Sequence, residues 1–396
     1  MDPINNRLII RAPNRAPKRT SLVFVRLLII ALIAFMVIMA FSSGCTSISY
    51  ILEQGVGQLS IQNRAISNDK ILRRPLLNPE VRRKISNIGK YKEFFFSYFN
   101  RQANKIYSKT TFLENSAVSY LVIASNYYEI KSKQHCFWLV GCFPYLGFFD
   151  KESALKYQRE LEKKKYVTWL RPVYAYSSLG YFEDNILSSF FVYDDENLAE
   201  VIFHELFHTV FFIKSEVELN ENLANYFSQE LVSLFFNYSN QQKQDRLVKQ
   251  QQKDQVKKIL VEMIQRFAQT LERNKPSNQI QSNLMLHEFL SFELIPRLKA
   301  QCNEFKLVNK ICDLYLKYEW NNASMTEFLT YENNQNDIIK LRDKYSQTES
   351  LAQFLSFIER KYAEYNDYNG NTRNSGVNKI SFKEYLFSMV DNNLKH

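Results

Sequence analysis

Hydrophobic residues recur at helical spacing along most of the chain. The stretch "QVKKILVEMIQRFAQTL", residues 255–271, repeats apolar positions every three or four residues, which is typical of an amphipathic helix. Asn78 is a cap residue and Pro79 follows it, so the pattern predicts a helix that starts at Pro79. Only 9 Gly and 9 Pro occur in 396 residues, which leaves few breaks between such segments. The pattern therefore predicts a mainly helical protein.

Alternating and aromatic stretches predict a small sheet before the helical part. Residues 116–125 read as a strand, residues 166–180 alternate like a strand rich in Val, Tyr and Trp, and the aromatic stretch 136–149 reads as a strand and turn. Between them, residues 151–165 read as an amphipathic helix. From Asp194 onward nearly everything reads as helix. The expected fold class is α+β, mainly helical, with a small sheet preceding a helical body.

Composition divides the chain into four parts. Residues 1–45 read as a signal sequence, 46–77 as a polar tether with a short helix, 78–193 as an α+β part and 194–396 as a helical body. The whole chain is 45% hydrophobic and 15% aromatic, so disorder is a poor interpretation for most of it.

The first 45 residues predict export. Six Lys or Arg residues precede the apolar run 27–41, which is followed by small residues and Cys45. This resembles a bacterial lipoprotein signal with Cys45 lipidated, although Ser42 stands where such signals usually carry Leu. An uncleaved membrane anchor and cleavage to a soluble form are the alternatives, since the run approaches the roughly 20 residues that span a bilayer. We expect the bacterial envelope, with a membrane-anchored protein that faces the periplasm.

The charge follows the same division. The formal charge is +10, and the signal contributes six basic residues against the single acidic Asp2, so +5 remains on the rest. A nucleic-acid partner is not needed to explain this balance, and the basic, Gln-rich block 241–258 is interpreted as a solvated helix and loop.

Four further cysteines form two close pairs, which are Cys136 with Cys142 and Cys302 with Cys312. An even number in an oxidising compartment favours disulfides within the pairs, with Cα atoms about 4.4 to 6.8 Å apart. The second bridge is expected less firmly, because ten residues of helix would hold its cysteines too far apart. Four buried free thiols are the alternative.

The candidate chemistry lies in "VIFHELFHTVFF", residues 201–212. Asp194 and the acidic residues after it predict a helix from about Glu196 to Phe212. His204 and His208 then project from one face, as two ligands of one zinc ion must. Glu205 stands beside them and suits the general base for a zinc-bound water.

Zinc needs a third protein ligand and an open position. Residues 214–236 predict a second helix, capped by Asn220, whose first turn carries Glu221. Glu221 followed at the third position by the small Ala224 allows this helix to pack closely on the first, so that Glu221 completes the ligand set. The alternative to a zinc site is a buried helix in which the two histidines bind no metal. The remaining residues His135, His287 and His396 have no neighbours at ligand spacing.

Beyond this motif, four stretches resemble the family of bacterial predicted aminopeptidases, lipoprotein-like zinc metallopeptidases of the gluzincin-like class. They are "GCTSISYILEQGVGQL", "CFWLVGCFPYLGFF", "AYSSLGYFEDN" and "WNNASMTEFLTY". The resemblance implies a zincin-like arrangement, with Zn²⁺ as cofactor and a peptide as substrate. It implies substrate binding at an edge strand with Ala175 and Tyr176, an α-ammonium site at Glu183 and Asp184, and oxyanion stabilisation by Tyr331.

The sequence thus predicts a zinc-dependent peptidase, in the first place an aminopeptidase. An endopeptidase of the envelope is the alternative within the enzyme class. A non-catalytic lipoprotein that uses the same fold to bind peptides is the other. The intact Glu205 favours an enzyme, because a degenerate peptidase has no structural need for it.

Overall fold

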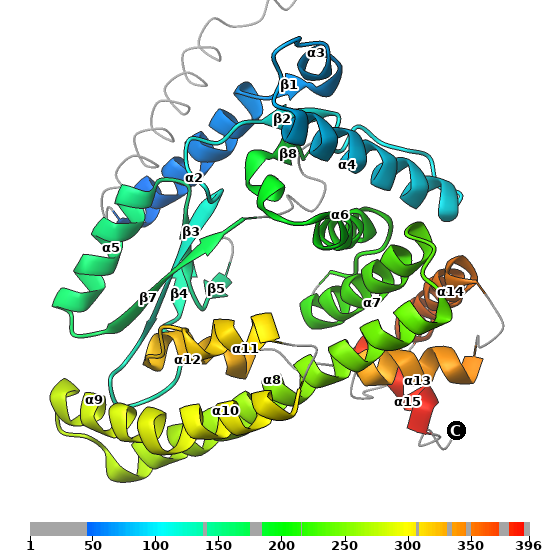
Figure 1. Ribbon diagram of the computed structural model, residues 1–396. Coiled ribbons are helices and arrows are strands. Elements are labelled where there is room, and N and C mark those ends of the chain that lie inside the picture. The colour runs from blue at the N-terminus through cyan, green and yellow to red at the C-terminus, as the bar shows by residue number, and fades with distance from the viewer. Residues whose placement is uncertain are drawn as a thin grey trace, which may run out of the picture. The chain divides into compact units, whose positions relative to one another are not determined.

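The computed structural model describes residues 46–137, 141–174, 184–214, 216–305, 309–330, 335–345, 350–371 and 380–391. Helices dominate these residues and the strands are short (Figure 1), which confirms the α+β, mainly helical prediction. Contacts divide the chain into two compact units, Met1–Val56 and Gly57–His396. None of the described helices is long and apolar enough to cross a bilayer.

The segment expected to be a tether contains more structure than expected. It forms α2 (Thr46–Asn63), β1 (Ile66–Ser67) and α3 (Asn68–Leu72). Within the larger unit, Gly57 packs on the ring of Phe149, and a Cβ atom placed on Gly57 would lie 2.3 Å from Phe149 Cδ2. Only glycine therefore fits this contact, which joins α2 to the segment after the sheet.

The next helix, α4 (Pro79–Tyr98), begins at the predicted residue. The Asn78 side chain accepts hydrogen bonds from the backbone N–H groups of Glu80 and Val81, at 2.8 and 3.4 Å. Pro79 costs no helical hydrogen bond at this first position. The buried aromatic residues Tyr91 and Phe95 place α4 in the main core, where both rings contact Phe203.

An antiparallel sheet of order β6-β3-β7 follows, made of β3 (Ser119–Ser125), β6 (Leu146–Phe148) and β7 (Val167–Val173). Alternate residues of β3 face opposite sides. On one side, Tyr120 contacts Lys151 of α5 (Lys151–Lys163). On the other, Ile123 and Trp169 pack with Ala323 of α12 (Asn322–Thr330). The sheet is therefore covered by a helix on each face.

A second small sheet leads into the helical body. Its strands are β1, β2 (Lys109–Thr111) and β8 (Ile186–Leu187), and β2 pairs with β8 in parallel. From β8 the chain passes through the 3₁₀ helix η1 (Ser188–Val192) to the helix that carries the histidines. This sheet therefore leads directly into that helix.

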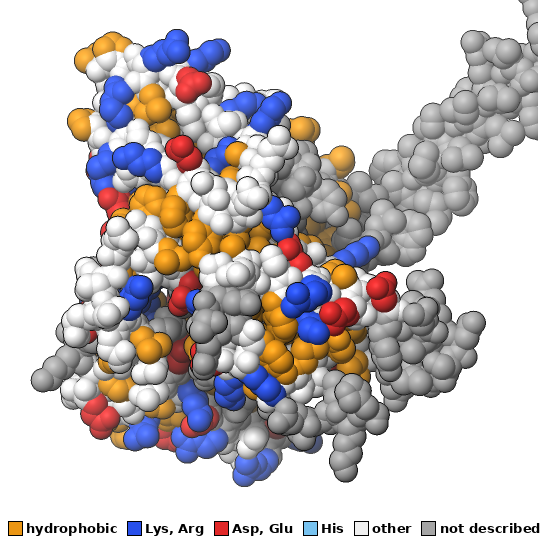
Figure 2. All heavy atoms as spheres, turned by 90° about the vertical axis from the view of Figure 1, so that its right-hand side faces the viewer, with side chains coloured by type: hydrophobic (Ala, Val, Ile, Leu, Met, Phe, Trp, Pro, Cys, Tyr) orange, Lys and Arg blue, Asp and Glu red, His pale blue; other side chains and the backbone are white. Residues whose placement is uncertain are grey.

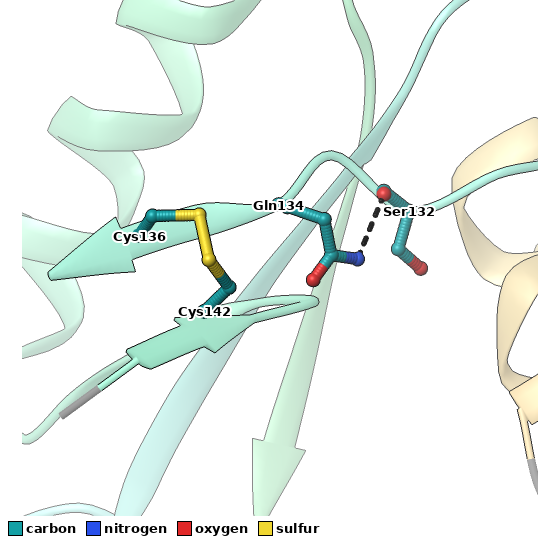
Figure 3. Close-up of a disulfide and its surroundings, with 4 residues drawn as sticks. All are labelled: Ser132, Gln134, Cys136 and Cys142. Atoms are coloured by element: carbon teal, nitrogen blue, oxygen red, sulfur yellow. Dashed lines mark hydrogen bonds between the residues drawn. A yellow bond between two sulfur atoms is a disulfide. The ribbon is translucent and has the colours of Figure 1, made fainter.

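The aromatic stretch forms a hairpin of β4 (His135–Phe137) and β5 (Gly141–Phe143), closed by a disulfide between Cys136 and Cys142 (Figure 3). The Cα atoms are 3.9 Å apart, which is below the expected 4.4 to 6.8 Å. The register brings the two residues together, because Cys136 lies directly opposite Cys142 in an antiparallel pair.

The helical body contains two cores. One surrounds α6 (Asp195–Val210) and α7 (Val217–Phe235) and includes buried residues of α4, α13 (Gln335–Tyr345), α14 (Leu351–Asn371) and α15 (Phe382–Asp391). The other gathers residues from the remaining helices, which are α8 (Asn240–Asn274), α9 (Gln279–Glu288), the π-helix η2 (Phe289–Leu294), α10 (Ile295–Glu304), α11 (Asn309–Leu316) and α12.

A disulfide joins Cys302 of α10 to Cys312 of α11, with Cα atoms 5.9 Å apart. The expected obstacle was a single helix through both cysteines. It does not arise, because α10 ends at Glu304 and α11 begins at Asn309.

The basic block 241–258 lies within the long helix α8 rather than in a helix and loop. Figure 2 shows Lys and Arg side chains spread over the visible face among acidic and hydrophobic ones. The positive charge is not gathered into one stripe on that face.

Candidate metal centre

The histidine helix α6 is defined by its first turn. Asp194 is the N-cap, and its carboxylate accepts a hydrogen bond of 2.9 Å from the backbone N–H of Asn197. The acidic residues Asp195 and Glu196 in the first turn complement the helix dipole. The helix then runs to Val210, so that His204 and His208, four residues apart, lie on one face.

Helix α4 holds the start of α6 in place. Lys84 is buried, and its ammonium donates to the backbone carbonyl of Tyr193 and lies 3.3 Å from the carboxylate of Asp195. Arg83 pairs with the same carboxylate, and the Tyr91 hydroxyl donates to the Asp195 carbonyl at 3.2 Å. The two helices are thus joined by charge and hydrogen bonds as well as by aromatic packing.

The predicted cap of the second helix was wrong. Helix α7 begins at Val217, after Glu216, one turn before Asn220. The buried Asn220 side chain instead accepts from the Ile213 N–H at 2.9 Å and donates to the Ile213 carbonyl at 2.8 Å. It therefore closes the connection between α6 and α7, and Glu221 lies in the second turn of its helix.

The two helices bring His204, His208 and Glu221 together. The histidine Nε2 atoms are 3.2 Å apart, and the Glu221 carboxylate oxygens lie 3.2 Å from His204 Nε2 and 3.4 Å from His208 Nε2. Metal–ligand bonds of about 2.0 to 2.1 Å at tetrahedral angles separate neighbouring ligand atoms by about 3.3 Å. Among the described residues, this group could hold a metal ion.

Burial and charge favour the ligand state of these groups. The His208 side chain is 3% exposed, whereas Glu221 is 45% exposed, so the centre is closed on one side and open on the other. Burial alone would raise the pKa of the Glu221 carboxyl, but hydrogen bonds and attraction from the two histidines outweigh it and lower that pKa to about 2. The carboxylate is therefore ionised at neutral pH, as a metal ligand must be.

Glu205 occupies a different environment on the same helix. Burial raises the pKa of its carboxyl; the two histidines oppose this effect, while the negative charges of Glu221 and Asp184 add to it. A carboxyl whose pKa is raised toward neutral pH both accepts and returns a proton readily. Glu205 thus has the environment of a general base and is not part of the ligand group.

The family model described as "Putative aminopeptidase" matches residues 49–371, which is most of the chain. The chain belongs to this aminopeptidase family. The comparison with curated proteins found no match, and neither did the comparison with solved structures. The aminopeptidase resemblance expected from the sequence is thus confirmed at the level of the family.

Of the residues proposed to bind substrate in this aminopeptidase-family chain, Asp184 is described. It is buried, and its carbonyl accepts a hydrogen bond of 2.7 Å from the backbone N–H of Tyr107. Burial raises the pKa of the Tyr107 phenol, and the negative charges of Glu205 and Asp184 raise it further. Both residues therefore lie near Glu205. Ala175, Tyr176, Glu183, Tyr331 and Cys45 lie outside the described residues.

Sequence reasoning missed Asn225, which lies one turn beyond Glu221 on α7. Burial lowers the pKa of the His204 imidazole, but the hydrogen bond with Glu221 and the charges of Glu205 and Glu221 outweigh it, and a hydrogen bond with the Asn225 side chain adds to the rise. Hydrogen bonds of this kind orient histidine ligands. The i, i+4 spacing from Glu221 was the signal that could have found it.

In this aminopeptidase-family chain, the described residues of the stretch "WNNASMTEFLTY" have a structural role. The Asn322 amide donates to the carbonyls of Asn126, Tyr127 and Glu129 at 3.3, 2.9 and 3.1 Å. Asn321 and Ser324 each accept a hydrogen bond from the backbone N–H of the other, both of 2.9 Å, at the start of α12. These contacts dock α12 on the turn after β3.

Proposed function

We propose that the protein is a zinc-dependent aminopeptidase of the bacterial envelope. The observation that carries the proposal is the convergence of His204, His208 and Glu221 with Glu205 beside them on the same helix. Two imidazoles and one carboxylate are the ligand set of many catalytic zinc sites, which keep one position open. The exposed side of Glu221 provides the corresponding access.

His204, His208 and Glu221 would hold the ion, which when bound polarises the scissile carbonyl and acidifies a water. The Glu205 carboxylate accepts a proton from the attacking water and passes it to the leaving amine. Its raised pKa, which is caused chiefly by burial, suits it to both transfers. Asn225 keeps the His204 ring in its orientation.

Asp184 is our candidate for binding the free α-ammonium of the substrate. It is buried, and its negative charge acts on Glu205, so it lies close to the base. A carboxylate in such a place attracts an ammonium group more strongly than one in water. Glu183 would share this role, Ala175 and Tyr176 would pair with the peptide backbone, and Tyr331 would stabilise the oxyanion.

The envelope location rests on the basic residues, apolar run and Cys45 at the N-terminus, which favour lipidation or an uncleaved anchor. Two disulfides among the described residues support an oxidising compartment.

The test is a metal assay on the purified full chain together with hydrolysis of a peptide panel in which each member has a free and an N-acetylated form. We expect about one zinc per chain and cleavage of the free peptides only. Asp184→Asn should raise KM for the free peptides.

Equal cleavage of free and acetylated peptides would identify an endopeptidase. A zinc-loaded protein that cleaves no peptide would instead support the non-catalytic, peptide-binding alternative.

A further inference from the structure

Helix α2 has an apolar face that is turned toward solvent. Leu52, Val56 and Leu59 follow the i, i+4, i+7 spacing of one helical face, and their exposed fractions are 64%, 66% and 56%. A helix of a soluble protein normally turns such a face toward the core. Three large apolar side chains in one stripe on the surface therefore require a covering partner.

The opposite face of the same helix is fixed to the folded body in its second half. Gly57 packs against Phe149, and Ile61, one turn further along, is buried. At 100° per residue, both positions lie on the side of α2 away from Leu59. The close backbone contact at Gly57 thus orients this half of α2 so that Leu59, on the other side of the helix, is exposed.

The position of α2 in the chain indicates what covers the stripe. The helix begins at Thr46, directly after Cys45, and the apolar run 27–41 ends a few residues earlier. At 1.5 Å per residue, Leu52 lies about 9 Å and Leu59 about 20 Å along the helix from Thr46. A lipid or apolar anchor at residue 45 therefore holds the whole stripe within reach of the bilayer surface.

The low charge of α2 is consistent with a bilayer as the covering partner. Glu53 is the only charged residue of α2, and it lies to one side of the stripe. A helix that lies in the membrane interface buries its apolar face among the headgroups and upper acyl chains. Tethering next to the surface replaces the strong basic face that free interfacial helices use, because it raises the local concentration of lipid.

We propose that α2 lies on the bilayer surface with Leu52, Val56 and Leu59 in contact with lipid. The proposal rests on the anchoring part of the proposed function and is independent of the metal centre. In this arrangement the membrane contact continues past the anchor into the folded protein, and Gly57 joins it to the sheet through Phe149.

The experiment uses the full chain in phospholipid vesicles and a tryptophan placed at the stripe. Val56→Trp is compared with Leu284→Trp on α9, where the wild-type leucine is similarly exposed, at 61%. The wild-type chain gives the background fluorescence and quenching of the native tryptophans. With brominated lipids we expect strong quenching of the added fluorescence of Val56→Trp and little quenching for Leu284→Trp. Leu52→Trp is a second probe of the same face.

Flotation and peptide hydrolysis are measured on the same samples. If the chain floats with the vesicles but the two stripe variants are quenched no more than the Leu284→Trp control, the proposal is wrong, while anchoring and peptidase activity stand. If the chain does not float, anchoring and the proposal fail together, and hydrolysis still reports on the metal centre. Shielding of the tryptophan in Val56→Trp from aqueous iodide without vesicles would place protein, such as a second copy, on the stripe and would also overturn the proposal.

Discussion

At the scale of single residues, Glu205 separates chemistry from metal binding. It lies beside the ligand group without belonging to it. Glu205→Gln keeps the size of the side chain and all three ligands but removes the proton acceptor. We predict near wild-type zinc content and peptide hydrolysis lowered by about 10²- to 10⁴-fold.

The matched control is Glu196→Gln, which removes a carboxylate from the exposed first turn of the same helix. Metal analysis and kcat/KM on one free peptide are measured for both variants. Wild-type turnover by the Glu205 variant would contradict its assignment as the base, whereas joint loss of zinc and activity would make Glu205 a structural support of the metal.

Two glycines of α2 offer a second comparison between single residues. A Cβ at Gly57 would lie 2.3 to 2.8 Å from side-chain atoms of Phe149, whereas among the described residues no atom lies within 4 Å of a Cβ at Gly55. Gly57→Ala should therefore lower the free energy of unfolding by about 1 to 3 kcal/mol. Gly55→Ala should raise it by up to about 1 kcal/mol through helix propensity. Denaturant titration measures the free energy of unfolding of both variants. Equal values for the two would contradict the close contact at Gly57.

At the scale of elements, the contacts between α4 and α6 position the helix that carries the candidate metal centre. The buried Lys84 contacts both the carbonyl before the α6 cap and the carboxylate in its first turn. Lys84→Met keeps most of the apolar stem but leaves these oxygens without their buried donor. We predict a loss of about 1 to 3 kcal/mol in the free energy of unfolding.

Lys90→Met is the control, because Lys90 is an exposed lysine of the same helix. Urea denaturation of the two variants is compared under identical conditions. If both are as stable as wild type, the charge contacts contribute nothing and aromatic packing alone holds α4 on α6.

Element boundaries show what the sequence could and could not predict. Asn78 and Asp194 signal helix starts through local capping, and the structure places α4 and α6 there. Asn220 carries the same local signal, yet its amide bonds Ile213 across the interhelical connection. That choice depends on a tertiary contact, which no local pattern contains. The break between Cys302 and Cys312 escaped prediction for the same reason, since both flanks are helical.

The candidate site was more predictable than the loops around it. Helical spacing alone places His204 and His208 together, and a short connection leaves the next helix few ways to pack. Asp184 comes from the segment before β8 and Tyr107 from the segment before β2, so their approach to Glu205 could not be predicted from helical spacing. The sequence therefore allowed the convergence of His204, His208 and Glu221 to be predicted, because it depends on local spacing.

At the scale of the whole molecule, the two cores should respond to different chemistry. The candidate metal centre lies on α6 and α7, which belong to one core, while the disulfide between Cys302 and Cys312 lies in the core around α8 and α10. A ligand present at 100 times its Kd stabilises the state that binds it by about 2.7 kcal/mol. We predict that a chelator speeds hydrogen exchange in α6 and α7, and that a reductant speeds it in α10 and α11.

The chelator and the reductant serve as controls for each other. Peptide-resolved mass spectrometry measures hydrogen exchange after each treatment. Uniform acceleration by either reagent would show that the two cores unfold as one cooperative unit. An unchanged α6 and α7 after chelation would count against a resident metal.

The closure of the α6–α7 connection by Asn220 also bears on the order in which the protein folds. All three ligands belong to one helix–turn–helix segment, so bringing them together closes only a short loop, and such contacts form early. The sheet and the C-terminal helices are not needed for that first encounter. If the protein is exported and holds a metal ion, as we propose, this segment can bind the ion as soon as it emerges, and the bound ion would then favour the docking of the elements before and after it.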